Sequence, residues 1–236
     1  GSADFLRQLQ PVFKIASGDN NFFPLIETVA SFGKPTMIST GLADTDLVDR
    51  LFYLWNRQAD APALAFLHCV SCYPAPESQA NLGAIQTLRG RYPGVTVGYS
   101  DHTMGNTTPL FAVAAGARII EKHFTLDKNR SDFRDHSLSA DPKEMENLVV
   151  EIRRLEQIMG NGIKAPQACE VSSASSMRRS ITVARDVDAN HELQPIDLVW
   201  LRHGSGVTVG QGSDFIGRRT NRSLSRGEII RLEDLR

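Results

Sequence analysis

Residues 95–125 read VTVGYSDHT, then MGNTTPLFAVAAGA, then RIIEKHFT. The first and last pieces are rich in β-branched residues and end in polar ones. The middle piece has the small apolar residues of a short helix, closed by Gly116. This order predicts a strand–helix–strand unit, the building block of a parallel sheet.

A histidine and a carboxylate stand together at the end of each predicted strand of this unit. Asp101 precedes His102, and Glu121 precedes His123 by two residues. Because the carboxyl ends of parallel strands are where α/β folds build their sites, we expect the two imidazoles at one edge of the sheet. Two imidazoles there can share one divalent metal ion and leave positions open for water and substrate. The alternative is a pair of unrelated surface histidines.

The same alternation of strand and helix continues upstream. Strands are predicted at 11–19, 36–41 and 64–70, and helices at 23–32, 44–58 and 81–91. Regular alternation of this kind predicts a (β/α) barrel or an open parallel sheet. A complete barrel has eight such units, so five strands indicate either an open sheet or a barrel without its first part.

The polar segment 127–140 follows the fifth strand. It is interpreted as a solvated connection or, because it leaves the edge that carries the histidines, as a substrate-facing lid. A helix is then predicted over 142–159, with Asp141 as N-cap, Pro142 at the first position and Glu144 at the third.

The chain is expected to form two domains. Residues 1–160 form the barrel-type domain, the Gly-, Pro-, Ala- and Ser-containing stretch 161–176 is a linker, and 177–236 form a small β-rich domain. That last domain is rich in arginine. Its basic face either increases solubility or binds an anionic substrate or the acidic loop of a neighbouring molecule. The arginines are Arg178, Arg179, Arg202, Arg218, Arg219, Arg222 and Arg226.

Composition excludes several classes of partner. Of the 236 residues 41% are hydrophobic, and the formal charge of −1 gives no reason to expect nucleic acid or an anionic membrane as partner. No apolar run approaches the roughly 18 residues that span a bilayer. The three cysteines, Cys69, Cys72 and Cys169, indicate a reducing, cytoplasmic compartment. Cys69 and Cys72 form a CxxC without a second pair, so we interpret them as ordinary thiols.

Six motifs in order along the chain resemble the sialic acid (nonulosonate) synthase family. They are KIASGD (14–19), PTMISTG (35–41), HCVSCYPAP (68–76), GYSDHT (98–103), EKHFT (121–125) and SLSADP (137–142). The C-terminal part resembles the family's antifreeze-like domain. Its motifs are MRRSITVARDV (177–187), WLRHGSG (200–206), IGR (216–218) and RGEII (226–230). The resemblance implies strands four to eight of a TIM-type barrel followed by a β-clip module, with no counterpart of the first three strands.

The resemblance also implies a reaction. Members of the family condense phosphoenolpyruvate with an N-acyl hexosamine to a nonulosonic acid, and phosphate leaves by C–O cleavage. His102 and His123 match the ligands of a divalent ion, most typically Mn²⁺ and alternatively Mg²⁺ or Co²⁺. That ion polarises the aldehyde of the open-chain sugar.

The remaining site residues are carried over from the motifs. Lys14, Ser17, Ser39 and Ser100 match contacts to phosphoenolpyruvate, for which an ammonium and hydroxyl donors suit phosphate and carboxylate. Ser71 stands where some sialic acid synthases have an asparagine that contacts the phosphate, so it departs from the family pattern at a substrate-binding position. Asp19, Tyr73 and Asp135 match positions near the sugar, and Glu121 matches a carboxylate beside the metal. Arg202 matches the arginine that the antifreeze-like domain inserts into the partner's site, which implies a domain-swapped homodimer. His203 stands where the family usually has proline.

Three functions are therefore weighed. The first is a nonulosonic acid synthase. The second is a catalytically incomplete fragment or sugar-acid-binding module. The third is another phosphoenolpyruvate-condensing barrel, such as an aldulosonate-phosphate synthase, against which residues 177–236 argue because those enzymes lack the antifreeze-like domain. N-acetylmannosamine, its 6-phosphate and diacetamido sugars stay open as acceptors.

Overall fold

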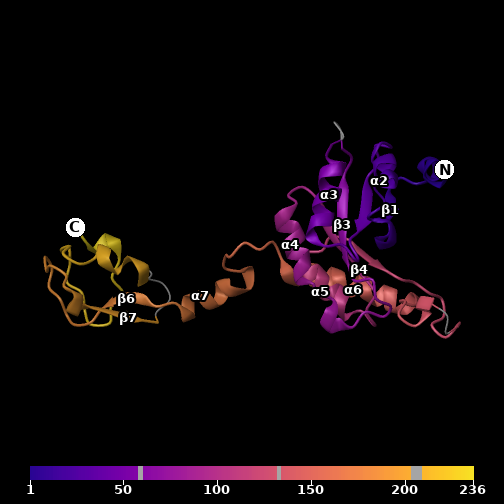
Figure 1. Ribbon diagram of the computed structural model, residues 1–236. Helices are drawn as coiled ribbons and strands as arrows, with labels where there is room; N and C mark the ends of the chain where they lie inside the picture. The colour runs from indigo at the N-terminus through magenta and orange to yellow at the C-terminus, as the bar shows by residue number, and fades with distance from the viewer. Residues whose placement is uncertain (58–60, 132–133, 203–208) are drawn as a thin grey trace. The chain divides into compact units, whose positions relative to one another are not determined.

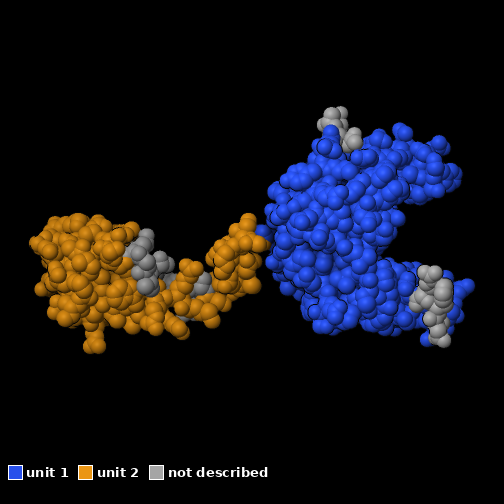
Figure 2. Space-filling view, viewed as in Figure 1, with its two compact units in different colours: residues 1–161 blue, residues 162–236 orange. Residues whose placement is uncertain are grey.

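The protein consists of two compact units, Gly1–Asn161 and Gly162–Arg236, as seen in a computed structural model (Figures 1 and 2). The structure describes residues 1–57, 61–131, 134–202 and 209–236. The second unit begins with the stretch predicted as a linker. That stretch contains a 3-10 turn at Ala168–Glu170 and the short helix α7 at Val171–Met177.

The first unit is built on a five-stranded parallel sheet that curls into a half-barrel (Figure 1). The strands are β1 (Phe13–Ile15), β2 (Thr36–Ser39), β3 (Leu64–Cys69), β4 (Thr96–Asp101) and β5 (Ile120–Lys122). They lie in the order in which they occur in the chain, so each helical connection joins neighbouring strands. The five predicted strands are confirmed, and so is their alternation with helices.

Helices cover one face of this sheet. They are α2 (Phe23–Ala30), α3 (Thr45–Trp55), α4 (Gly83–Arg91), α5 (Thr107–Ala114) and α6 (Pro142–Met159). Another helix, α1 (Ser2–Leu9), has no counterpart in the sequence prediction, and none of its residues is buried. Among the described residues, no helix is long and apolar enough to cross a membrane.

The core lies between the sheet and these helices. Phe13, Ile38 and Phe66 project from three successive strands into a buried cluster that also contains Leu51 and Trp55 of α3. Because side chains alternate across a strand, every second residue of β1–β5 faces this core, and the residues between them face the concave side of the sheet. The space-filling view shows the first unit hollowed on one side (Figure 2).

Helix α6 begins as predicted. The Asp141 carboxylate accepts a hydrogen bond from the Glu144 backbone N–H at 2.8 Å, and Glu144 accepts one from the Asp141 N–H at 3.2 Å. This reciprocal capping satisfies two donors at the helix start. Gly160 ends the helix with a φ of 59°, which a residue with a side chain rarely adopts.

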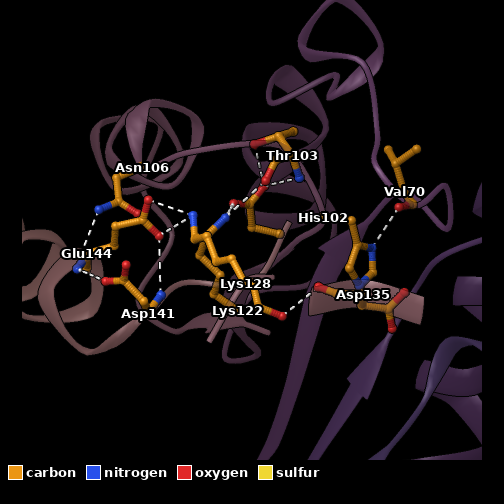
Figure 3. A network of polar contacts seen from close by, with 11 residues as sticks. Val70, His102, Thr103, Asn106, Lys122, Lys128, Asp135, Asp141 and Glu144 are labelled. Carbon is orange, nitrogen blue, oxygen red and sulfur yellow. Dashed lines mark hydrogen bonds and ion pairs between the residues drawn. The ribbon is translucent and has the colours of Figure 1, made fainter. Parts of the chain in front are cut away.

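The described part of segment 127–140 is tied back to the end of β5. Ala140 donates its N–H to the His123 carbonyl at 2.8 Å, and the ring of His136 lies 2.8 Å from the Thr125 hydroxyl. Lys128 forms an ion pair with Glu144 at 2.5 Å (Figure 3). These contacts return the chain to the edge of the sheet that carries the histidines.

The second unit is small and β-rich. Strands β6 (Ser180–Val183) and β7 (Leu198–Leu201) pair antiparallel, in agreement with the β-rich character predicted for this part of the chain. Isolated bridges add further pairing, such as Val187 with Leu224. The core of this unit consists of Ile181, Val183, Val187, Leu193, Leu198, Phe215, Leu224, Ile230 and Leu235.

Several arginines of the second unit are neutralised within it. Arg219 pairs with Glu192, and Arg222 pairs with both Glu228 and Asp234. Of the seven arginines named in the sequence analysis, the other five make no ion pair with a described residue. They are Arg178, Arg179, Arg202, Arg218 and Arg226. The expected basic face is thus reduced to a few free guanidinium groups.

Acid is expected to destabilise the second unit through Asp197. This buried carboxylate accepts hydrogen bonds from Arg185 at 2.6 Å and from the Gln194 N–H at 2.8 Å, and His191 lies 2.8 Å away. Burial raises the pKa of Asp197, but the hydrogen bonds from Gln194, His191 and Arg185 outweigh it and leave the pKa below its ordinary value of 3.8. A lowered folded-state pKa gives stability that is present above the unfolded pKa and is lost as pH falls through the folded one.

The second unit of the wild-type chain should therefore lose stability as the pH falls below about 4. Asp197→Asn should be less stable at pH 7 and should show a weaker dependence on acid pH. Urea unfolding of the chain at pH 3 to 7, followed by the fluorescence of Trp200 in a Trp55→Phe background, measures both. An unchanged acid dependence in Asp197→Asn would assign the effect to other carboxylates.

Candidate active site

The site lies on the concave side of the sheet, at the carboxyl ends of the strands. The register places Cys69 beside Ser100 and Ser100 beside Glu121, so these three residues share one face and one level. His102 and His123 come two residues after Ser100 and Glu121, so the alternation of the strands directs them to the same side. The sequence prediction of two imidazoles at one edge follows from this register.

Asp101 lies on the opposite face of β4. Its carboxylate accepts a hydrogen bond from Lys122 at 2.6 Å and others from the Thr103 N–H and hydroxyl, and the Asp101 and Lys122 side chains are 0% and 1% exposed (Figure 3). The acid that stands beside His102 in the sequence therefore belongs to the packed layer behind the site. Only Glu121 shares a face with its histidine.

The two imidazole rings approach each other closely. The ring centroids of His102 and His123 are 5.1 Å apart, at an interplanar angle of 80°. The ring of Tyr73 lies 4.1 Å from that of His102 and 5.7 Å from that of His123. Tyr73, predicted near the sugar, therefore covers both histidines from the segment that follows β3.

Each imidazole is held through its Nδ1 atom. Nδ1 of His102 lies 2.9 Å from the Val70 carbonyl oxygen (Figure 3). Nδ1 of His123 lies 3.3 Å from the Asp135 carboxylate. A carbonyl oxygen accepts only, so Nδ1 of His102 carries the proton and Nε2 of the neutral ring keeps a free lone pair. The same tautomer is favoured for His123 by Asp135.

This arrangement fits a divalent ion. Metal-binding histidines donate their other ring N–H to a carbonyl or carboxylate, which fixes the ring and its tautomer. His102 has such a partner in the Val70 carbonyl, and the Asp135 carboxylate lies 3.3 Å from Nδ1 of His123, so Nε2 of each ring is left for a metal ion. Among the described residues, however, no three His, Cys, Asp or Glu side chains converge as a metal-binding group. The residues present thus supply two nitrogen ligands.

The protonation equilibria of the site are coupled. Burial lowers the pKa of His102, but hydrogen bonds to Cys69 and to the Val70 carbonyl outweigh it, so the pKa lies above its usual value. Burial and the neighbouring His102 lower the pKa of His123. Burial raises the pKa of Tyr73, and the nearby charges of Cys69 and Asp135 add to the effect.

Lys14 and Glu121 meet across the curled sheet. They come from β1 and β5, the first and last strands in the order, and their charged atoms are 3.0 Å apart. The contact is an ion pair rather than a well-aligned hydrogen bond, since Oε2 of Glu121 is buried without a hydrogen-bond partner. Both residues were predicted as site residues, and the curvature of the sheet brings them together.

Serine hydroxyls gather around Gly41, after the end of β2. The Ser17 hydroxyl accepts a hydrogen bond from the Gly41 N–H at 3.1 Å and donates one to the Cys69 sulfur at 3.4 Å. A Cβ atom on Gly41 would collide with the Ser71 hydroxyl and lie 2.6 Å from that of Ser17. The hydroxyls of Ser39 and Ser71 are buried and have no hydrogen-bond partner among the described residues. Buried hydroxyls with unused hydrogen-bonding capacity suit an anion.

Gly41→Ala is expected to weaken the binding of inorganic phosphate at least tenfold while leaving the fold intact. The added methyl group would displace the hydroxyls of Ser17 and Ser71 from the cradle. The circular dichroism spectrum and thermal midpoint should stay close to wild type. Phosphate affinity, measured by ³¹P NMR titration, checks the prediction, and Gly83→Ala is the matched control because its Cβ meets open space. Equal phosphate affinity in Gly41→Ala and wild type would contradict it.

Two predicted residues are not joined to this group. Asp19 is exposed after β1, and its carboxylate makes no ion pair with a described residue. Arg202 is exposed after β7 in the second unit and likewise makes no such pair with one. His203, predicted to stand for a proline, lies outside the described residues.

Cys69 and Gly41 line the site but were not predicted for it. The Cys69 sulfur lies 3.8 Å from Nδ1 of His102. Burial raises the pKa of its thiol, but hydrogen bonds with His102 and Ser17 outweigh this and lower the pKa. The alternation of β3 contains the signal, because Cys69 pairs in register with Ser100, a predicted site residue. All three cysteines are free.

Two family models match the chain. The NeuB family model matches residues 1–164, and the SAF domain model matches residues 178–236. An N,N'-diacetyllegionaminic acid synthase of Legionella pneumophila is 40% identical over 240 residues, which cover 99% of this chain and 66% of that relative. The chain spans about two thirds of the length of such curated relatives. The chain belongs to the NeuB family, which confirms the family recognised from its motifs.

Solved structures agree in fold. The N-acetylneuraminic acid (sialic acid) synthetase of Leptospira borgpetersenii, solved with citrate, is 40% identical with a TM-score of 0.65, over 69% of this chain and 56% of that one. The spore coat polysaccharide biosynthesis protein SpsE of Bacillus subtilis is 30% identical with a TM-score of 0.62, over 100% of this chain and 71% of that one. The half-barrel and the small antiparallel sheet are thus features shared with solved relatives.

Proposed function

We propose that the protein is a nonulosonic acid synthase that condenses phosphoenolpyruvate with an N-acyl hexosamine and water, releasing inorganic phosphate. The observation that carries the proposal is the pair of Nδ1-anchored imidazoles beside the serine cradle and Lys14. Relatives at up to 40% identity are named as synthases of legionaminic acid, N-acetylneuraminate 9-phosphate and pseudaminic acid.

The roles of the residues follow from their chemistry. The hydroxyls of Ser17, Ser39, Ser71 and Ser100 and the ammonium of Lys14 would bind the phosphate and carboxylate of phosphoenolpyruvate. Nε2 of His102 and of His123 would hold a divalent ion, with Mn²⁺ as the first choice. When bound, such an ion supplies Lewis-acid polarisation of the sugar aldehyde.

The other residues orient the sugar and the histidines. Asp135 fixes His123 at 3.3 Å and lies at the edge where the sugar would enter. Tyr73 lies over both imidazoles and would exclude water from that side. Asp19, exposed at the same edge, would accept hydrogen bonds from sugar hydroxyls. The new bond joins carbon 3 of the enolpyruvate to the aldehyde carbon, water adds to carbon 2, and the C–O bond to phosphate breaks.

The second unit would complete the site of another subunit. The free guanidinium of Arg202 suits the N-acyl oxygen of the sugar, which supports a domain-swapped homodimer. We also propose that the five strands correspond to strands four to eight of a TIM-type barrel and that the second unit is a β-clip. The three free thiols favour a cytoplasmic location.

Phosphate release from phosphoenolpyruvate tests the proposal. With Mn²⁺ and N-acetylmannosamine, or a diacetamido hexose, the chain should release phosphate, and omission of the sugar or addition of EDTA should abolish the release. Release that persists in EDTA would contradict the metal assignment. Lys14-dependent binding of phosphoenolpyruvate without any release would instead favour a binding module.

A further inference from the structure

Lys14 has two possible partners in the site, the Glu121 carboxylate and the anionic substrate. Lys14 is the cation that would receive the anionic substrate, yet its ammonium already lies 3.0 Å from a carboxylate. The two side chains are 28% and 41% exposed, so the pair lies within reach of a ligand on the concave side of the sheet.

Glu121 depends on this contact. Its Oε2 atom is buried and has no hydrogen-bond partner among the residues that the structure describes, and Lys14 is the described group that balances its charge. A partly desolvated carboxylate is costly without a counter-charge. The side chain of Glu121 is therefore held where an incoming phosphate or carboxylate oxygen would approach the ammonium.

We propose that Glu121 is a positioning residue that occupies Lys14 in the empty site and competes with the anionic substrate for it. The inference rests on the proposed function, because that function assigns the anion to Lys14. Binding of phosphoenolpyruvate would transfer Lys14 from Glu121 to the substrate. After the reaction, Glu121 would recover Lys14 and so promote the departure of inorganic phosphate.

Two roles of Glu121 can be distinguished with one variant: Glu121 either competes with the anion for Lys14 or holds Lys14 in position to bind the anion. If Glu121 competes for Lys14, Glu121→Gln frees the ammonium and anions bind more tightly. If Glu121 instead holds Lys14 in the binding position, the same variant binds anions more weakly. Competition through Lys14 also requires that the effect disappears when Lys14 is replaced, whereas simple removal of a negative charge near the site would not depend on Lys14.

The experiment is a set of ³¹P NMR titrations with inorganic phosphate and with phosphoenolpyruvate, carried out in EDTA on the full chain. The variants are wild type, Glu121→Gln, Lys14→Met, the double variant and Glu27→Gln. Glu27 is the matched control, because it is an exposed acid of α2 away from the site. Glu121→Asp keeps the negative charge on a shorter side chain. It therefore distinguishes the loss of the charge from a local structural change caused by the glutamine side chain.

We expect Glu121→Gln to bind both ligands about three- to tenfold more tightly, as for the loss of a half-exposed ion pair. Glu27→Gln should match wild type, Glu121→Asp should lie between wild type and Glu121→Gln, and the double variant should equal Lys14→Met. If Glu121→Gln binds the anions no more tightly than wild type while Lys14→Met binds them more weakly, this inference is wrong but the anion-binding role of Lys14 in the proposed function stands. Equal tightening in the Lys14→Met background would also overturn it. Binding that is independent of Lys14 would overturn the anion role in the proposed function as well.

Discussion

Replacing His102 and His123 together by alanine is expected to weaken Mn²⁺ binding by at least about 100-fold, since loss of even an outer partner of a metal ligand typically costs 10- to 100-fold. Both free Nε2 lone pairs disappear in this variant, while the Val70 carbonyl and the Asp135 carboxylate lose only the ring that each of them holds. Free Mn²⁺ measured by electron paramagnetic resonance gives the affinity directly. The double alanine variant should also lose manganese-dependent phosphate release.

The control for this experiment is His191→Gln. His191 lies in the second unit and contacts Asp197, so its loss should leave Mn²⁺ affinity unchanged. Asp135→Asn should give an intermediate loss of about 10- to 100-fold, because it keeps His123 but weakens the group that orients it. Wild-type Mn²⁺ affinity in the double alanine variant would sink the assignment of the metal to these histidines.

Replacing Lys122 by methionine is expected to destabilise the first unit by about 3–5 kcal/mol, the usual cost of breaking a buried ion pair by removing one partner. Asp101 would keep a buried charge, to which the Thr103 N–H and hydroxyl would still donate. Since Thr103 follows His102 directly, the loss should also disturb the position of that ring. Urea unfolding reports the change, followed by Trp55 fluorescence in a Trp200→Phe background because Trp55 is buried in this unit.

The double variant Asp101→Asn/Lys122→Met should recover part of this loss, because the uncompensated charge is then absent. Arg91→Ala is the exposed comparison. Its bidentate pair with Asp49 lies at the surface, so its removal should cost about 1 kcal/mol or less. Similar destabilisation by Lys122→Met and Arg91→Ala would show that the buried pair contributes no more than a surface pair.

The elements with a clear local signal were predicted from the sequence. Stretches rich in β-branched residues with polar ends, separated by helix-like stretches, gave the five strands and the helices between them, and the Asp141–Glu144 capping box gave the start of α6. Helix α1 lies before the first predicted strand and was not predicted, and none of its residues is buried. The 3-10 turn and helix α7 within 161–176 were missed because Ser- and Ala-containing stretches favour no single structure strongly.

The sequence motifs identified most residues of the candidate site, but not the contacts between them. The motifs identified Lys14 and Glu121 separately, whereas their ion pair depends on the curvature of the whole sheet. Asp101 precedes His102 in the sequence, but the alternation of the strand places it on the opposite face, where it pairs with Lys122. Cys69 was judged as half of a CxxC motif, although its place on β3 puts it against His102.

The order of the sheet has a consequence for hydrogen exchange. Strand β3 pairs with a neighbour on each side and all its residues are buried, whereas β1 and β5 each have one neighbouring strand in the sheet and three residues each. Amide protons of β3 should therefore exchange only through global opening of the unit, and those of β1 and β5 through smaller openings. Lys14 and Glu121 lie on these two outer strands, so an anion bound at Lys14 should slow exchange more in β1 than in β3.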